Sequence, residues 1–224
     1  YLKADFVDIY TDVPGIAVTD PRLVPEAPFI PKVSYEEAIT MAENGAKVIH
    51  PRAVKAAKQF NLKVRVKSTF DDSEGTLVGP EASDLIVSGI SAAKDLAVAK
   101  YERERAFTDD EVAKLQTLSA DKTLYDSNSE ERVILISEED KDTAKNLAEE
   151  LNAQVNLFEN MSKVSAVYKA TIDSRAVDEK IMATLLKEDI QVIAKKVLAD
   201  HCAYIVKNDC VGKCVKAIYK TYFN

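Results

Sequence analysis

Short apolar runs alternate with amphipathic segments through the first eighty residues. Phe6–Tyr10 and Lys63–Lys67 predict strands, and in the second of these the valines alternate with basic residues, which gives the strand one buried face. A helix is predicted to begin after Ser34, because Ser34 and Glu37 have the spacing of a capping box, and a second helix begins at Pro51. Strands that alternate with helices predict an α/β layer built on a parallel sheet.

From about residue 85 onward, the pattern of strands and helices is that of two similar units. In the first unit, strands are predicted at Leu96–Ala99, Lys122–Tyr125, Arg132–Ile136 and Val155–Phe158, with a turn at Asp126–Ser129 and helices that begin at Thr108 and Ser137. In the second unit, strands are predicted at Lys163–Lys169, Ile190–Ile193 and Ala203–Val206, with helices from Ser174 and Val211. The order β-α-β-β-α-β is typical of the ferredoxin-like split motif.

The composition changes near residue 80. All seven prolines lie in the first eighty residues, and Gly212 is the only glycine after Gly89. Such a change marks a boundary between architectures, and the polar, turn-rich stretch 79–83 suits a connector. The sequence therefore predicts three parts: an α/β part at residues 1–80, a first ferredoxin-like unit at residues 85–160 and a second one at residues 161–224.

Composition and charge exclude some classes of function. The chain has 224 residues, of which 46% are hydrophobic and 30% are charged, as is typical of a globular protein. A net charge of −7 without a dominant basic patch argues against nucleic acid as a partner. No apolar run approaches the ~20 residues that span a bilayer, so no membrane partner is expected.

The three cysteines, Cys202, Cys210 and Cys214, are odd in number and lie in the last quarter of the chain. Such usage fits a reducing cytoplasm better than a disulfide framework. A zinc site that includes His201 is the alternative, but these spacings match no compact zinc motif. Core packing is therefore the expected role of the cysteines, and no metal site is predicted.

Several motifs in the first eighty residues occur in an order that is specific to one family. They are Asp8–Ile16, Thr19–Arg22, Ser34–Ala38, Gly45–Ala53, Val64–Thr69 and Gly75–Leu77. Together these motifs resemble the nucleotide-binding end of the catalytic domain of aspartate kinases. The resemblance implies an amino-acid-kinase fold, in which ATP with Mg²⁺ phosphorylates the side-chain carboxylate of aspartate, the first step of lysine, threonine and methionine biosynthesis.

The resemblance also implies roles for five residues. Thr11 and Asp12 match the family's contacts on the adenine side of ATP. Arg22 and Lys47 match its phosphate-side contacts, and Val48 matches a residue beside the base. Cationic side chains suit the phosphate-side role because they neutralise charge on a transferring phosphoryl group. The alternative is that both cations are ordinary solvated surface residues.

Two differences from the family limit what the chain is expected to do by itself. Ala17 stands where many relatives carry an aromatic residue, which predicts weaker binding of the nucleotide. The family's lysine- and glycine-rich motif and its aspartate-binding residues are expected upstream of these residues, and Gly75 and Gly79 are not followed by the Gly-Lys-Ser/Thr of a P-loop. No catalytic residue is therefore assigned to the chain, and alone it is expected to be inactive.

The second part of the chain resembles the two ACT domains that end aspartate kinases. Residues 85–224 have the length, position and element order of these domains, and Lys163–Val167 resembles the first strand of the second one. The resemblance implies a homodimer formed through ACT sheets, with lysine, threonine or diaminopimelate bound at such interfaces as an allosteric effector. It leaves open whether Leu85–Ile90 pairs with the sheet of the second ACT domain, so that the two domains interleave.

Asp173 and Ser174 are the candidate effector contacts, because both are able to bind an amino group. The family's glycine-rich loop is replaced here by Ala170–Arg175, although loops that approach a ligand closely usually need glycine. The alternative is that Asp173 and Ser174 simply cap the helix that follows.

Three interpretations of function remain at this point. In the first, the chain is the C-terminal part of an aspartate kinase, and its own role is regulation and dimerisation. In the second, it is a non-catalytic regulatory subunit that retains a relic of the kinase lobe. In the third, it is part of another amino-acid kinase that acts on glutamate or carbamate, although the ACT-like tail and Tyr10–Asp12 argue against this.

Overall fold

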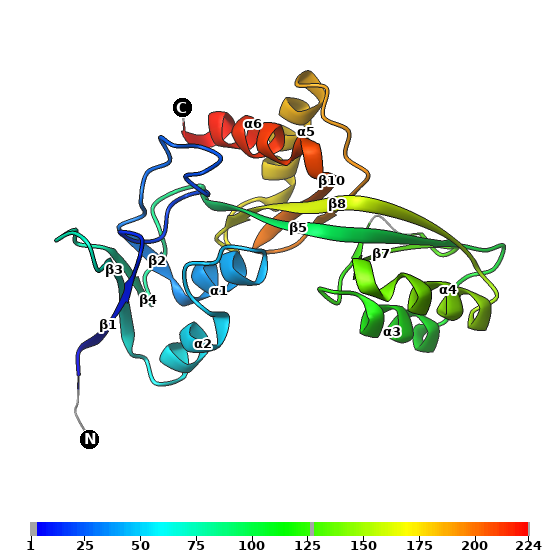
Figure 1. The fold of residues 1–224 in the computed structure, drawn as a ribbon, viewed down its shortest axis with the longest axis horizontal. Helices are drawn as coiled ribbons and strands as arrows, with labels where there is room; N and C mark the ends of the chain where they lie inside the picture. Colours follow the sequence, from blue (N-terminus) through cyan, green and yellow to red (C-terminus); the bar gives the residue numbers. More distant parts are fainter. Residues whose placement is uncertain (1–3, 126–127, 224) are drawn as a thin grey trace.

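A computed structural model describes residues 4–125 and 128–223 and shows two sheets (Figure 1). The first is a four-stranded sheet with the order β1-β3-β4-β2. Its strands are β1 (Phe6–Thr11), β2 (Lys32–Ser34), β3 (Lys63–Ser68) and β4 (Thr76–Gly79), and its helices are α1 (Tyr35–Glu43) and α2 (Pro51–Gln59). The predicted turn at Asp126–Ser129 lies partly outside the described residues.

Local signals place both helices of this first part. Ser34 and Glu37 make both hydrogen bonds of the predicted capping box at the start of α1. Pro51 occupies the first turn of α2, and the ring of His50 accepts a hydrogen bond from the Arg52 backbone N–H. Each helix therefore begins where its sequence predicts.

The first sheet is mixed, so the prediction of a parallel sheet was wrong in part. Strand β1 pairs with β3 and β2 pairs with β4 in parallel, but β3 and β4 are antiparallel. The reason is the connection 69–75 between β3 and β4, which is too short for the crossover that parallel neighbours need.

The second sheet has six strands in the order β6-β7-β5-β8-β10-β9. Its strands are β5 (Val87–Glu102), β6 (Leu124–Tyr125), β7 (Glu131–Ser137), β8 (Gln154–Tyr168), β9 (Ala194–Val197) and β10 (His201–Lys207). Its helices are α3 (Asp109–Leu118), α4 (Lys141–Glu150), α5 (Ser174–Lys187) and α6 (Val211–Phe223), and short 3₁₀ turns at Glu138–Asp140 and Asn208–Cys210 precede α4 and α6.

Strands β5 and β8 run through both halves of the six-stranded sheet (Figure 1). The first half of β5, Val87–Ala93, pairs with the end of β8, and its second half, Leu96–Glu102, pairs with the start of β8 and with β7. The segment Leu85–Ile90, whose pairing the sequence left open, therefore joins the half of the sheet that contains β10. The separately predicted strands Val155–Phe158 and Lys163–Lys169 are one continuous strand, because register shifts take the place of a turn.

One predicted strand is in the wrong place. Ile190–Ile193 was expected to be a strand, but β9 begins only at Ala194. Ile190 is buried in the core and its N–H donates to Leu185 O at the end of α5. Ile190 is apolar because it closes α5 against the core, so its hydrophobicity was a correct signal of burial and a wrong signal of strand.

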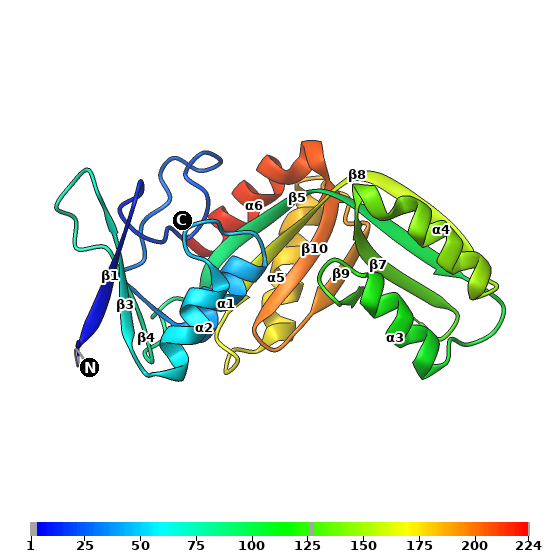
Figure 2. The same cartoon turned by 60° about the horizontal axis from the view of Figure 1, so that its bottom comes forward.

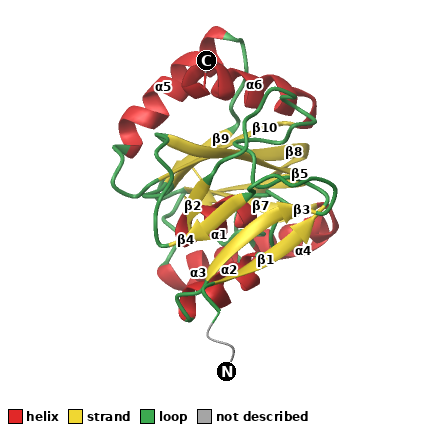
Figure 3. Ribbon diagram, turned by 90° about the vertical axis from the view of Figure 1, so that its left-hand side faces the viewer, coloured by secondary structure: helices red, strands yellow, loops and turns green. Residues whose placement is uncertain are grey.

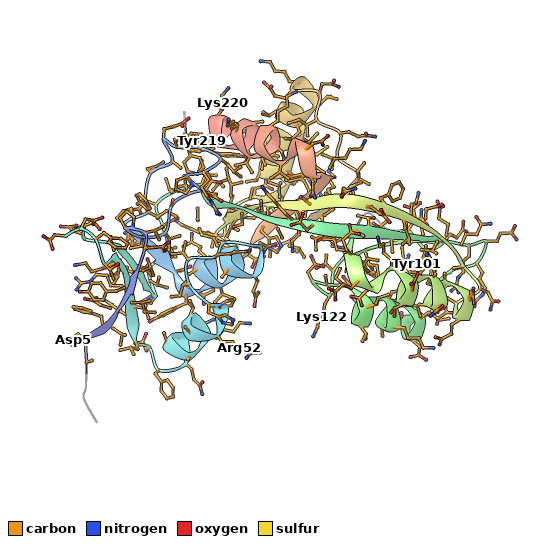
Figure 4. The ribbon with its side chains drawn as sticks, viewed as in Figure 1. Asp5, Arg52, Tyr101, Lys122, Tyr219 and Lys220 are labelled. Atoms are coloured by element: carbon orange, nitrogen blue, oxygen red, sulfur yellow. The ribbon has the colours of Figure 1, made fainter. Side chains whose placement is uncertain are left out.

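The helices cover the six-stranded sheet from opposite sides. Helices α5 and α6 lie on one side, and α1, α3 and α4 lie on the other (Figures 1 and 2). In the view along the long axis, the strands lie between these two outer layers (Figure 3). Tyr101, labelled in Figure 4, lies under α4 and donates a hydrogen bond to Ala144 O at 3.1 Å.

Buried apolar residues in the described part of the chain form three clusters. The largest is continuous from the first part of the chain into α5 and α6, where Tyr219 stacks on Phe223 and donates to Glu26 O at 3.4 Å. A second cluster lies under α3 and α4. A third lies between the two halves of the six-stranded sheet and contains Val98, Tyr125, Val133, Leu135, Met161, Ala194, Ala203 and Ile205. Both sheet halves therefore depend on a shared apolar interior.

A buried ion pair joins the two halves of this sheet. Lys163 on β8 lies 2.8 Å from Asp121, which follows α3, and their side chains are 6% and 18% exposed. The Tyr125 hydroxyl also donates to Asp121. Burial alone favours the neutral carboxyl, but the charge of Lys163 and the donated hydrogen bonds hold the pKa of Asp121 below its usual value.

We predict that Lys163→Met destabilises the chain by about 3–5 kcal/mol, because it leaves the Asp121 carboxylate buried without its cation. Lys114→Met is the matched control, since Lys114 also pairs with a carboxylate but the pair is exposed. Urea unfolding at pH 7 measures both. Equal stability of the two variants would contradict a role for the buried pair.

The same pair predicts a pH dependence. Because the folded pKa of Asp121 lies below its unfolded value of 3.8, its stabilisation is complete above pH about 5 and is lost as the pH falls from about 4 through the lowered pKa. Asp121→Asn removes this titration, so its unfolding free energy should vary less between pH 5 and pH 3 than that of the unaltered chain.

Candidate functional site

The candidate site lies at the carboxyl ends of β1 and β3. These strands are parallel, so Thr11 and Ser68 are paired at the same edge of the sheet, where ligands commonly bind in α/β proteins. The Thr69 backbone N–H and its hydroxyl donate to Thr11 O at 2.9 and 3.0 Å. The Thr11 hydroxyl donates to Val13 O at 2.9 Å, so it shapes the turn that leaves β1. The side chain of Asp12 follows directly and is exposed.

Thr76 holds the loop that follows β1. Its fully buried hydroxyl accepts a hydrogen bond from the Ile16 N–H at 2.8 Å and donates to Ile30 O at 2.6 Å. The loop also reaches the second sheet, because the Ile90 N–H donates to Val18 O at 2.6 Å. A single side chain therefore satisfies two buried backbone groups of the loop.

Helix α1 delivers the second loop of the site. The helix ends at Asn44, and Gly45 turns the chain with a φ of 111°, which disfavours any residue with a Cβ. The loop then presents Val48 to a small apolar pocket that it shares with Ile16. The remaining lining residues of this pocket are Ala38, Met41, Ala42, Ala46 and Ile49. Val48, the residue predicted to lie beside the base, therefore meets Ile16 from the loop after β1.

The two predicted phosphate-side cations are both at the surface. Arg22 is 86% exposed, and its Nε and Nη2 atoms donate to the Asp20 carboxylate at 2.7–3.1 Å. The guanidinium of Arg22 lowers the pKa of Asp20. Lys47 is exposed and makes no ion pair with any residue that the structure describes. The structure brings neither cation into contact with the other.

Glu37 is a further polar centre that sequence analysis assigned only to the capping box. Its carboxylate is 3% exposed and accepts hydrogen bonds from Ser34 N at 2.8 Å, Ser83 N and Oγ at 3.0 Å each, and the Ser88 hydroxyl. Burial favours the neutral form, but these bonds hold the pKa of Glu37 below its usual value. Ser83 and Ser88 are 46 and 51 residues away in sequence, so no local pattern reveals their contacts with Glu37.

The candidate effector residues lie at the start of α5. The Asp173 carboxylate accepts hydrogen bonds from the backbone N–H groups of Arg175 and Ala176 at 3.0 and 3.3 Å, which is the arrangement of an N-cap. The backbone carbonyl oxygen of Ser174 accepts a hydrogen bond from the Cys202 thiol at 3.8 Å. Binding of an effector at these two residues stays a prediction.

A buried polar cluster beneath α5 was missed by sequence analysis. The Asp178 carboxylate accepts hydrogen bonds from the Tyr204 hydroxyl at 3.0 Å and from Lys195 at 2.7 Å. Burial raises the pKa of Tyr204, so the phenol stays protonated and donates. The continuous apolar run Cys202–Val206 in β10 fits the burial of Tyr204 but gives no sign of its partner.

The described residues contain neither a group of side chains that could hold a metal ion nor a helix that could cross a membrane. Within residues 4–125 and 128–223, no three His, Cys, Asp or Glu side chains are grouped so that they could hold a metal ion. In the same part of the chain, no helix has the length and apolar character needed to cross a membrane.

We predict that Thr76→Val destabilises the chain by about 2–4 kcal/mol, because an isosteric side chain leaves the Ile16 N–H and Ile30 O buried without partners. Thr69→Val is the control, since the exposed Thr69 hydroxyl makes one hydrogen bond in the same site. Urea unfolding compares them. If Thr76→Val costs no more than Thr69→Val, Thr76 does not hold the loop.

Comparison with known proteins places this geometry in a family. Residues 1–68 match the amino acid kinase family. Over 205 residues, the chain is 30% identical to aspartokinase 1 of Bacillus subtilis, which covers 86% of this chain and 50% of that protein. It is 32% identical over 204 residues to the aspartokinase of Geobacillus stearothermophilus, with 85% and 50% coverage. The chain spans about half the length of the curated relatives it matches.

Solved structures agree with this assignment at the level of the fold. Escherichia coli aspartokinase III, in complex with aspartate and ADP, superposes with a TM-score of 0.83 at 23% identity, over 100% of this chain and 53% of that one. The aspartate kinase of Clostridium acetobutylicum gives a TM-score of 0.84 at 21% identity, over 97% and 54%. The predicted fold class, an amino-acid-kinase segment followed by ferredoxin-like elements, is thereby confirmed.

Fold and site thus define a segment of an amino acid kinase joined to a ferredoxin-like sheet. The chain belongs to the aspartokinase family, as its sequence motifs predicted.

Proposed function

We propose that the chain is the nucleotide-side and regulatory portion of an aspartokinase, which uses ATP to phosphorylate the side-chain carboxylate of aspartate. One observation carries the proposal. In a segment related to aspartokinases, the loop after α1 places Val48 in an apolar pocket with Ile16 while Lys47 faces solvent beside it. Val48 is only partly buried, so it would offer an apolar surface to a flat base, and the exposed cation of Lys47 next to it would attract a phosphate chain.

The five predicted contacts divide the work of binding ATP. Val48 would supply an apolar surface for the base, and Thr11 and Asp12, at the end of β1, would contact the adenine side. Lys47 and Arg22 offer positive charge to the phosphates, which Mg²⁺ would accompany.

We infer that the rest of a kinase domain packs against β1. This strand pairs only with β3 among the described strands, and Phe6, Val7 and Tyr10 on it are 44%, 41% and 57% exposed. An open edge with exposed apolar side chains is a surface for another strand. That partner segment would supply the acceptor site for aspartate and the catalytic residues.

The ferredoxin-like part is proposed to bind an amino-acid effector and to form a homodimer through its sheets. Lysine, threonine and diaminopimelate are the candidate effectors. Support comes from E. coli aspartokinase III, whose fold this chain shares and which has been solved with lysine and aspartate in its T-state. The alternative is a separate non-catalytic subunit. Support for it comes from the regulatory subunit of Thermus thermophilus aspartate kinase, which shares the fold over 62% of this chain at a TM-score of 0.51.

We predict that the 224-residue chain alone forms no aspartyl phosphate from ATP and aspartate in a coupled assay, because half of a kinase sheet provides no acceptor site. Activity should appear when the chain is joined to, or mixed with, an amino-terminal aspartokinase half. Activity of the chain alone would overturn the proposed division of the site.

We predict that Lys47→Met weakens ADP binding by about 10- to 100-fold, the value of one charge-assisted hydrogen bond to phosphate. The measurement is calorimetry on the chain joined to a complete kinase domain. Lys55→Met is the matched control, because Lys55 is an exposed lysine on α2 that pairs with Glu43. Unchanged ADP affinity in Lys47→Met would remove Lys47 from the site.

A further inference from the structure

Helix α1 is fixed to the ferredoxin-like part at its first turn. The Glu37 carboxylate caps the helix and also accepts hydrogen bonds from Ser83 in the connector and from Ser88 on β5. Ser83 and Ser88 also bond to each other at 2.9 Å. All of these side chains are buried, so the first turn of α1 has one defined position relative to β5.

The last turn of α1 is fixed to the same sheet by a different contact. Asn44 is buried, its Oδ1 accepts a hydrogen bond from the Ser165 hydroxyl at 2.9 Å, and its Nδ2 donates to Thr40 O at 2.8 Å. Ser165 lies near the end of β8 and is fully buried. Between the two ends, the Thr40 hydroxyl donates to Asp200 at 2.9 Å.

The loop with Lys47 and Val48 begins at Gly45, which packs directly against the backbone of β5. A Cβ at Gly45 would lie 2.4 Å from the carbonyl oxygen of Ala92, so only glycine fits there. Helix α1 has nine residues and is about 14 Å long, and hydrogen bonds join both of its ends to the sheet. A displacement of β5 or β8 is therefore passed to the loop instead of being absorbed before it.

We propose that Ser165 is a positioning residue that couples the ferredoxin-like sheet to nucleotide binding, through its hydrogen bond to Asn44 and the loop 45–49. The proposal builds on the nucleotide site proposed above and adds its regulation. Ser165 acts at a distance from the nucleotide, since its only side-chain bond within the described residues is to Asn44. An amino acid that shifts β8 would change ADP affinity by this route.

The first test uses the 224-residue chain and needs no nucleotide. Amide hydrogen exchange at Gly45 and Ala46, whose N–H groups donate to Ala42 O and Met41 O, should become about three- to tenfold faster in Ser165→Ala, the factor that one net hydrogen bond is worth. Ser91→Ala is the matched control, because Ser91 is a buried serine paired with Ser165 across β5 and β8. Exchange in β10 should stay unchanged in both variants. Equal exchange of the loop in the two variants overturns the proposal.

The second test uses the chain joined to a complete kinase domain, with ADP as the probe and lysine or threonine as the effector. In Ser165→Ala the factor by which the effective amino acid changes ADP affinity should shrink about three- to tenfold, whereas Ser91→Ala keeps it. An unaltered factor in Ser165→Ala overturns the coupling role. Absence of ADP binding by the unaltered protein would instead refute the proposed nucleotide site, and the exchange experiment would still decide the role of Ser165.

Discussion

The pairing of β5 with β8 is the constraint on which the rest of the structure depends. The two strands stay side by side from Val87 opposite Tyr168 to Glu102 opposite Gln154, through both halves of the sheet. Neither half has a complete set of strands without them, and the buried pair of Lys163 and Asp121 fixes the halves together. The two ferredoxin-like units are therefore one cooperative body, whose central contact joins segments far apart in sequence.

This shared body also carries the candidate nucleotide site. The loop after β1 is held by the Ile90 N–H of β5, and α1 is held by Ser88 of β5 and Ser165 of β8. Glu37 is stabilised here by neutral donors alone among the described residues, so its contacts are directional and depend on geometry more than on net charge. The geometry of a site held by such contacts depends on the positions of β5 and β8.

Local signals in the sequence predicted the parts of the fold that local interactions determine. The capping boxes at Ser34 and Thr108 and the proline at position 51 marked three helix starts correctly. The continuity of β8 was not predictable in this way. Its polar stretch near Asn160 suggests a turn between two strands, but in the structure the strand continues there with a shift of register. The antiparallel pairing of β3 with β4 likewise follows from the short loop between them, and no local sequence pattern indicates that these two strands pair.

The candidate site shows the same division. Val48 and Ile16 lie within the motifs that resemble the family, and both line one small pocket. The contacts that position them involve Asn44 with Ser165, which are separated by 121 residues. Serine and asparagine in a strand and at a helix end are ordinary residues in sequence, and only the three-dimensional register makes them partners. Sequence motifs thus point to candidate ligand contacts more readily than to the residues that hold such contacts in place.

The two surface cations of the site differ in the charge they offer to a phosphate group. Asp20 occupies the Nε and Nη2 edge of Arg22, so it orients the guanidinium and cancels much of its charge. No described residue accepts a hydrogen bond from Nη1, so that side of the fork stays open to a phosphate oxygen. Lys47 has no counter-ion among the described residues and keeps its full charge. Arg22 is therefore suited to fix the direction of a phosphate and Lys47 to supply most of the attraction.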